Sequence, residues 1–248
     1  MTVIKSNEEV ASMRKAGRIV AVVLERLRNE VKPGISTKQL DAVAVDELKK
    51  RGARASFKGY RGYPANLCVS VNDEVVHGIP GERMLQEGDI VSLDFGAYVD
   101  NFHGDAAITV GVDKISPEAQ RLLDVTEAAL MEGIKAARGG AYLGDVSAVI
   151  QSYVETRGLS VIREYCGHGI GRALHEDPQV PNFGVAGQGP VLQKGITLAV
   201  EPMVTAGGWR TRLDDNKWTV RTADNSLAAH FEHTIAIGNA EPEILTVL

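Results

Sequence analysis

The chain has 248 residues, of which 44% are hydrophobic and 24% charged, and its formal net charge is −5. This length can bury a substantial core, and the mild acidity argues against a nucleic-acid or anionic-membrane partner. The polar start Lys5-Ser6-Asn7-Glu8-Glu9 and the lack of a long apolar run predict neither a signal peptide nor a membrane anchor. The distant Cys68 and Cys166 indicate free thiols in a reducing cytosol.

Capping signals and helix breakers predict four helices. Ser6 to Glu9 forms a capping box, and Ser36 or Thr37 caps a second helix that ends at Gly52. Ser116 followed by Pro117 begins a third helix. The predicted helices span about residues 7–31, 37–52, 117–138 and 146–157.

An antiparallel hairpin is predicted between the two helix pairs. Ile90–Tyr98 and Phe102–Val110 are rich in β-branched and aromatic residues, with turn chemistry at Val99-Asp100-Asn101. Asp94 and Asp105 would then lie roughly opposite each other, and directly opposed like charges destabilise a strand pair. A divalent cation would reverse the sign of that interaction. The alternative interpretation is a solvated face that carries two ordinary acids.

The order of elements repeats within the chain. Lys32–Gly52 aligns with Arg138–Gly158 without a gap, and Leu85–Gly88 is echoed by Leu192–Gly195, which places Asp94 on Glu201. His103-Gly104-Asp105 is echoed by His230-Phe231-Glu232, which places Asp105 on Glu232. We therefore expect two pseudo-symmetric α/β halves, about residues 1–115 and 116–248, whose four acids converge and need cations to stay ionised.

Histidines add a second set of candidate site residues. His168 lies among glycines in Cys166-Gly167-His168-Gly169-Ile170-Gly171, and an imidazole beside four acids suits Mn, Fe, Co and Zn better than Ca or Mg. His77 and His175 each begin an HxxP pattern, one in each half. They are interpreted either as parts of surface loops or as donors that face a metal-held substrate. We expect the remaining histidines, His103, His230 and His233, to be structural.

This ordered set resembles the methionine aminopeptidases of type I. The resemblance rests on Asp94, Asp105, His168, Glu201 and Glu232, on the stretch GYPANLCVSVNDEVVHGIP, on HGD and on FEHT, and it covers essentially the whole chain. It implies the pita-bread fold, an α/β arrangement with a central curved sheet flanked by helices, in a single catalytic domain over residues 1–248. The short spacing from His168 to Glu201 leaves no room for the type II insertion, so the chain looks like the short bacterial form.

The resemblance also implies a reaction and a set of roles. Two divalent ions, drawn from Co, Mn, Fe, Zn and Ni, would hold a water that attacks the first peptide bond and releases the initiator methionine before a small second residue. Asp94 would chelate one ion and His168 would bind the other, while Asp105 and Glu232 would bridge them. Glu201 would bind a metal and act as general base.

Further positions implied by the resemblance concern the substrate. His77 and His175 would contact the substrate amide and stabilise the tetrahedral intermediate. Phe57 and Leu174 depart from the family pattern, where a cysteine and a phenylalanine are usual. The implied lining of the methionine pocket consists of Tyr60, Tyr63, Cys68, Trp218, Phe57 and Leu174.

We expect a cytoplasmic monomer that acts on peptides and nascent chains, with the ribosome as a candidate partner and neither membrane nor nucleic acid as partners. Two alternatives stay open at this point. A proline-specific peptidase of the same fold is disfavoured because such enzymes usually carry an extra amino-terminal domain. A non-catalytic pita-bread binding module is disfavoured because all five ligand positions are present.

Overall fold

Four helices form in the computed structural model, which describes residues 2–248, and three of them begin at the predicted capping signals. Ser6 and Ser36 each accept a bond from the third backbone N–H of their helix, and Glu9 and Gln39 complete the two capping boxes. Gly52 ends the second helix in the left-handed conformation, with φ of 63°. The helices are α1 (Asn7–Glu30), α2 (Thr37–Arg51), α3 (Pro117–Ala136) and α4 (Leu143–Glu155).

Helix α4 begins three residues earlier than the sequence predicted. Tyr142 stands at its N-cap, and the Asp145 carboxylate accepts a 2.8 Å bond from the Tyr142 backbone N–H. Tyrosine is not a usual N-cap residue, so this start carried no clear sequence signal. Among the described residues, no helix has the length and apolar character needed to cross a bilayer.

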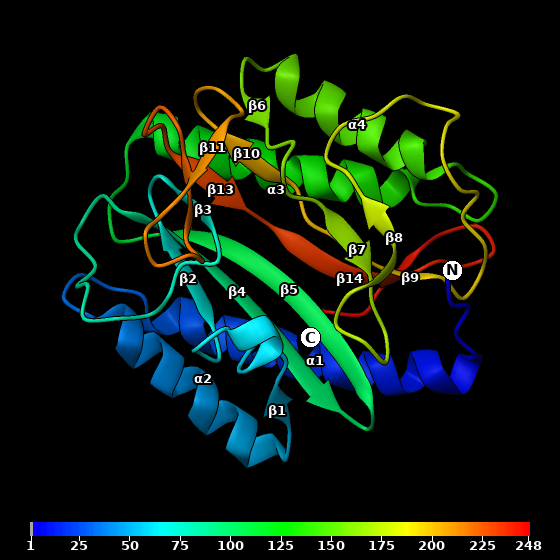
Figure 1. Ribbon diagram of the computed structural model, residues 1–248, viewed down its shortest axis with the longest axis horizontal. Coiled ribbons are helices and arrows are strands. Elements are labelled where there is room, and N and C mark those ends of the chain that lie inside the picture. Colours follow the sequence, from blue (N-terminus) through cyan, green and yellow to red (C-terminus); the bar gives the residue numbers. More distant parts are fainter. Residues whose placement is uncertain (1) are drawn as a thin grey trace.

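In the view of Figure 1, a central sheet crosses the molecule with α1 and α2 below it and α3 and α4 above it. In spatial order its main path is β1 (Arg54–Ala55), β4 (Ile90–Val99), β5 (Phe102–Gly111), β14 (Glu232–Ala236), β9 (Thr197–Val200), β7 (Gly167–Gly169) and β8 (Glu176–Val180). Two further strands join it, β2 (Cys68–Val71) beside β4 and β15 (Glu243–Ile244) beside β14. Helix α1 packs on β4 and β5, and α3 packs on β9 and β14. The predicted pita-bread architecture is confirmed.

Matching backbone contacts confirm the internal repeat. Ser36 bridges Met84 in the first half, and Tyr142 bridges Val191 at the corresponding place in the second. The Gly34 N–H donates to the Leu85 carbonyl and the Gly140 N–H donates to the Leu192 carbonyl, each at 2.8 Å. In both halves, therefore, the loop before the second helix is held against the segment that leads into the hairpin.

The first hairpin forms as predicted, with one refinement of its register. Asp100 and Asn101 both have positive φ, as a two-residue type I′ turn requires. Asp94 pairs with Ala107, whereas Asp105 pairs with Gly96, so the two acids are diagonal neighbours on one face rather than directly opposed. They avoid the closest like-charge contact and still point to the same side of the sheet.

The register of the second half corrects one equivalence. Met203, two residues after Glu201, pairs with His230, just as Gly96, two residues after Asp94, pairs with Asp105. The structural counterpart of Asp105 is therefore His230 and not Glu232, two residues further along. The sequence echo of HGD and HFE was offset by two positions because strand pairing, which the sequence does not display, sets the register.

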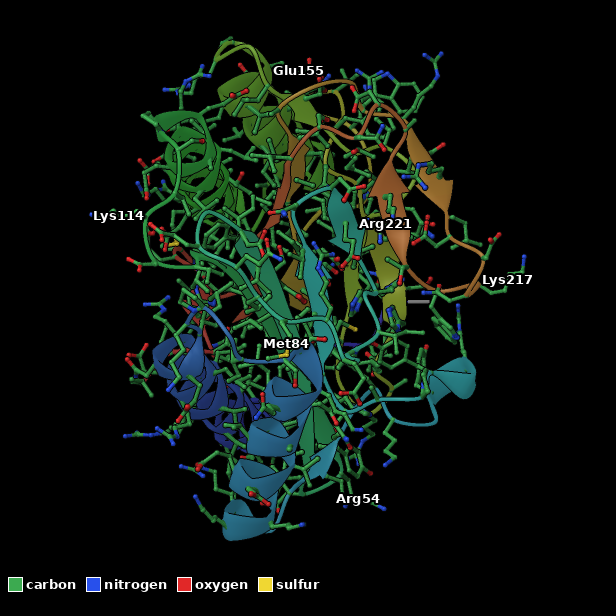
Figure 2. The ribbon with its side chains drawn as sticks, turned by 90° about the vertical axis from the view of Figure 1, so that its left-hand side faces the viewer. Arg54, Met84, Lys114, Glu155, Lys217 and Arg221 are labelled. Carbon is green, nitrogen blue, oxygen red and sulfur yellow. The ribbon has the colours of Figure 1, made fainter. Side chains whose placement is uncertain are left out.

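Two small sheets complete the fold. One contains β13 (Ala228–His230), β10 (Met203–Thr205) and β6 (Ser160–Val161), and the other contains β11 (Thr211–Leu213), β12 (Val220–Thr222) and β3 (Glu74–Val76). Figure 2 shows Lys217 at the tip of the β11–β12 loop and Arg221 further in, with the helices on the opposite side of the molecule. The one short 3₁₀ helix of the described residues, Tyr60–Gly62, lies on the same side as this loop.

Glycine allows α1 to approach the central hairpin closely. A Cβ added at Gly104 on β5 would lie 2.7 Å from the backbone nitrogen of Gly17 on α1. Any larger residue at position 104 must push α1 away from the sheet, because the atoms nearest to the added Cβ are backbone atoms of that helix.

We predict that Gly104→Ala lowers the free energy of unfolding by about 1–3 kcal/mol through this clash. Urea unfolding followed by circular dichroism measures the change. Gly81→Ala is the matched control, because the nearest atom to an added Cβ there is 4.0 Å away. An equal effect of the two substitutions would contradict the close-approach argument.

Candidate metal centre and active site

The five predicted ligand residues converge on one cavity of about 140 Å³. Asp94 on β4 and Asp105 on β5 come from the first half. His168 on β7, Glu232 on β14 and Glu201, directly after β9, come from the second. Since β5 and β14 are paired neighbours, the sheet itself brings the two halves of the cluster together. The Asp105 N–H donates to Thr234 Oγ1 at 3.0 Å, and the Thr234 hydroxyl donates to the Asp105 carbonyl at 2.7 Å.

The carboxylates are buried without enough hydrogen-bond donors. Asp94, Asp105 and Glu232 are 8%, 4% and 2% exposed. Oδ1 of Asp94, Oδ1 of Asp105 and Oε1 of Glu232 have no hydrogen-bond partner among the described residues. Unpartnered buried carboxylate oxygens are costly, and divalent cations are the partners that such a set accepts. The donor set therefore fits the metal ions that the resemblance implies.

The pKa values of the four carboxyl groups are all raised. Burial raises the pKa of Asp94 to about 7. Burial, and next the charge of Asp94, raise the pKa of Asp105 and of Glu201 well above the usual carboxyl range. Glu232 is shifted in the same direction, by burial and then by Asp105. The cluster thus resists full ionisation unless positive charge enters it.

His168 presents the correct nitrogen to the acids. Its Nδ1 lies 2.9 Å from the Gly169 carbonyl oxygen, which can only accept, so Nδ1 carries the proton. Nε2 is then free as a lone-pair donor and lies 3.6 Å from Glu201 Oε1. Donor atoms of Asp105, His168 and Glu232 lie within 4.8 Å of one another. A backbone carbonyl that fixes the tautomer is typical of metal-binding histidines.

His77 and His175 both line the cavity. His77 follows β3 with φ of 60°, and its ring lies edge-on to those of Tyr165 and Trp218. Burial lowers its pKa to about 4, so the ring is neutral near pH 7 and carries one N–H. His175 is at the more open rim, 2.9 Å from the Tyr60 hydroxyl through Nδ1, with its ring 4.0 Å from that of His168. Both side chains thus line the cavity that the acids share, His77 in a half-buried position and His175 in an exposed one.

An apolar wall faces the acids across the same cavity. The Tyr63 and Trp218 rings meet edge to face at 5.1 Å, and the Tyr63 hydroxyl donates to the Gly78 carbonyl at 2.9 Å. Phe57 and Leu174, the two departures from the family pattern, are both buried here. Every predicted pocket residue lines the cavity, namely Phe57, Tyr60, Tyr63, Cys68, Leu174 and Trp218.

Three residues of the site region were missed by sequence reasoning. Arg61 and Val76 line the cavity beside predicted members, and the position of Arg61 between Tyr60 and Tyr63 was the available signal. His230, expected to be structural, groups with Glu201 and Glu232 within 4.8 Å. His103 and His233 instead have partners outside the cluster, Ser56 and Thr246.

Comparisons with known proteins identify the family of the chain. Residues 11–239 match the model of metallopeptidase family M24. The chain is 50% identical to a methionine aminopeptidase of Clostridium perfringens over 248 residues, covering 100% of both chains. It is also 50% identical to methionine aminopeptidase 1 of Bacillus subtilis, covering 99% of both.

Solved structures show the same relationship. The crystal structure of a methionine aminopeptidase from Thermotoga maritima superimposes with a TM-score of 0.99 at 47% identity, over 100% of both chains. A Xaa-Pro dipeptidase from Bacillus anthracis shares the fold alone, with a TM-score of 0.81 at 22% identity, and this chain covers 62% of it. The chain therefore belongs to metallopeptidase family M24.

Proposed function

We propose that this protein is a methionine aminopeptidase, which hydrolyses the first peptide bond of peptides and nascent proteins that begin with methionine before a small residue. The observation that carries the proposal is that one cavity is lined both by apolar side chains and by His168 with four carboxylates, three of them buried. Relatives named methionine aminopeptidase, 50% identical over the full length, support it.

Asp94, Asp105, His168, Glu201 and Glu232 would hold two divalent ions of the first transition row. Carboxylate oxygens with one imidazole form a donor set that Mn, Fe, Co, Ni and Zn share. When bound, such ions polarise the scissile carbonyl and make water a stronger nucleophile near neutral pH. Asp105 and Glu232 each have an unpartnered buried oxygen and lie on the neighbouring strands β5 and β14, so both halves of the chain would supply donors to the ions.

Proton transfer falls to Glu201 in this proposal. Its carboxylate would accept a proton from the attacking water and deliver it to the amine that leaves. Burial beside Asp94 raises the pKa of Glu201, which favours proton acceptance. His77, neutral and with one N–H, and His175 at the rim would donate hydrogen bonds to the substrate amide as charge builds on its oxygen.

Substrate choice follows from the wall of the cavity. The methionine side chain would lie against Phe57, Leu174, Tyr63 and Trp218, while the free α-amino group would be drawn to the acids. A misfit of one methylene in an apolar pocket discriminates by only about 1–3 kcal/mol. Close analogues such as norleucine should therefore be cleaved as well.

Residues 1–248 would act as a single catalytic domain. The support for this proposal is that each half contributes metal donors, so neither half contains the complete set. Newly made chains carry their initiator methionine in the cytoplasm, which is where we place the protein, as a monomer that meets nascent chains near the ribosome.

Glu201→Gln should lower kcat for a Met-Ala-Ser peptide by about 10²- to 10⁴-fold, because the amide cannot accept the proton. Methionine release by metal-loaded protein measures it. Glu132→Gln, which alters a half-exposed acid paired with Lys135 on α3, is the control and should leave turnover intact. Full turnover by the Glu201 variant would exclude it as the base.

Metal-free protein should lose stability as pH rises. A carboxyl whose folded pKa is raised contributes stability that is complete below its unfolded pKa and lost as pH passes through its folded pKa. For Asp94 this window runs from 3.8 to about 7. With a chelator present, Tm should fall as pH rises from about 4 to about 7, and Mn²⁺ or Co²⁺ should raise Tm most at the higher pH.

Asp94→Asn provides the matched control for that measurement. Removing one of the crowded charges should flatten the fall in Tm of the chelator-treated protein with pH. A slope identical to that of the unsubstituted protein would show that the cluster is not the source of the pH dependence.

A further inference from the structure

His230 is a buried imidazole with no role in the proposed reaction. The residue is 1% exposed. Neither Nδ1 nor Nε2 has a hydrogen-bond partner among the described residues. A buried ring nitrogen without a partner is costly, so its position next to the acids calls for a physical reason.

The backbone of His230 is rigidly placed. Its N–H donates to Thr109 Oγ1 at 2.9 Å, and the Thr109 hydroxyl donates back to the His230 carbonyl at 2.8 Å. Thr109 belongs to β5, so a strand of the first half clamps this residue of the second. Pairing with Met203 gives His230 the register position that Asp105 occupies in the first half. The backbone position of His230 therefore directs its side chain toward the acids.

Glu201 lies between two imidazoles. Oε1 of Glu201 is 3.6 Å from His168 Nε2, and Oε2 is 3.6 Å from His230 Nε2. The nearest Glu232 oxygen to His230 Nε2, Oε2, is 3.9 Å away, so Glu201 is the closer acid. The two oxygens of one carboxylate thus face different imidazoles, one that belongs to the predicted ligand set and one that does not.

We propose that His230 is a positioning residue for Glu201: when the acids hold their cations, the 3.6 Å separation closes and the His230 Nε2–H donates a hydrogen bond to Glu201 Oε2. That bond leaves Oε1 as the oxygen presented to His168 and the cavity. It stops the carboxylate from rotating about its terminal torsion, which is otherwise broad and soft. The inference rests on the proposed function, since it assigns His230 a role through the proposed general base.

Three substitutions separate the roles that His230 could have. His230→Gln keeps an N–H donor, His230→Leu removes it at similar volume, and His230→Met is a second donor-free variant with a more adaptable side chain. His103→Gln, whose ring bonds Ser56 outside the metal cluster, is the matched control. Methionine release, calorimetric titration of metal-free protein with Co²⁺, and the visible absorption of the Co²⁺ form are measured for each.

We expect His230→Leu and His230→Met to lower kcat by about 10- to 100-fold and to weaken Co²⁺ binding by a similar factor, as loss of an outer hydrogen bond to a ligand does. KM should stay within about twofold, because the pocket wall is untouched. His230→Gln should restore most of both quantities with an unchanged Co²⁺ spectrum, and His103→Gln should match the unsubstituted protein.

Two results would overturn the proposal. Unchanged kcat and Co²⁺ affinity in a folded donor-free variant would show that His230 does not hold Glu201. A shifted Co²⁺ spectrum in His230→Gln, with lost affinity, would show that His230 binds the metal directly. If the unsubstituted protein released no methionine from any peptide, the proposed function would fail, while the Co²⁺ affinities and spectra would still decide the role of His230.

Discussion

Electrostatic repulsion among four carboxylates in one cavity is the constraint on which this structure depends. Burial raises the pKa of Asp94, and burial together with neighbouring acids raises the pKa of Asp105, Glu201 and Glu232. An apolar cluster at this place would avoid the repulsion, so the fold carries a local free-energy cost that proton uptake or bound cations reduce. The diagonal placement of Asp94 and Asp105 reduces that cost while both side chains still face one centre.

A network of ion pairs holds two strands beside the cavity in place. Arg221 on β12 joins three carboxylates, those of Asp73 and Glu74 at 2.7 Å and that of Asp214 at 2.6 Å. This network ties β3 of the first half to β12 of the second, and His77 and Trp218 lie at the ends of those strands. An ion-pair network among partly buried groups with short contacts is more effective than isolated surface pairs. The positions of His77 and Trp218 in the cavity wall are therefore stabilised by charged residues that do not themselves line the cavity.

Much of this arrangement could be predicted from the sequence because its signals are local. Capping residues located three helix starts, and the Asp100-Asn101 turn located the first hairpin. Repeated acids in an ordered series indicated the metal cluster. The start of α4 at a tyrosine cap could not be predicted, because its stabilising bond involves a residue type with no capping preference.

The role of His230 was hidden for a different reason. Its relation to Glu201 depends on which residues pair between β10 and β13. The similarity of HGD to HFE instead aligned Asp105 with Glu232, two residues beyond His230. Arg61 and Val76 likewise reach the cavity through the path of the backbone and not through a motif. Residue types and their spacing indicate which chemistry a site can perform, whereas the register of strand pairing decides which side chains lie in that site.

The pairing of β5 with β14 also has a consequence for biosynthesis. A chain made from its amino terminus completes Asp94 and Asp105 long before His168, Glu201 and Glu232 exist. Until then the hairpin offers two carboxylates, without the imidazole and without strand β14, so it can bind an ion only weakly. Metal capture should therefore be a late event in synthesis, coupled to the docking of the second half on the first, and the ion would help to close the molecule.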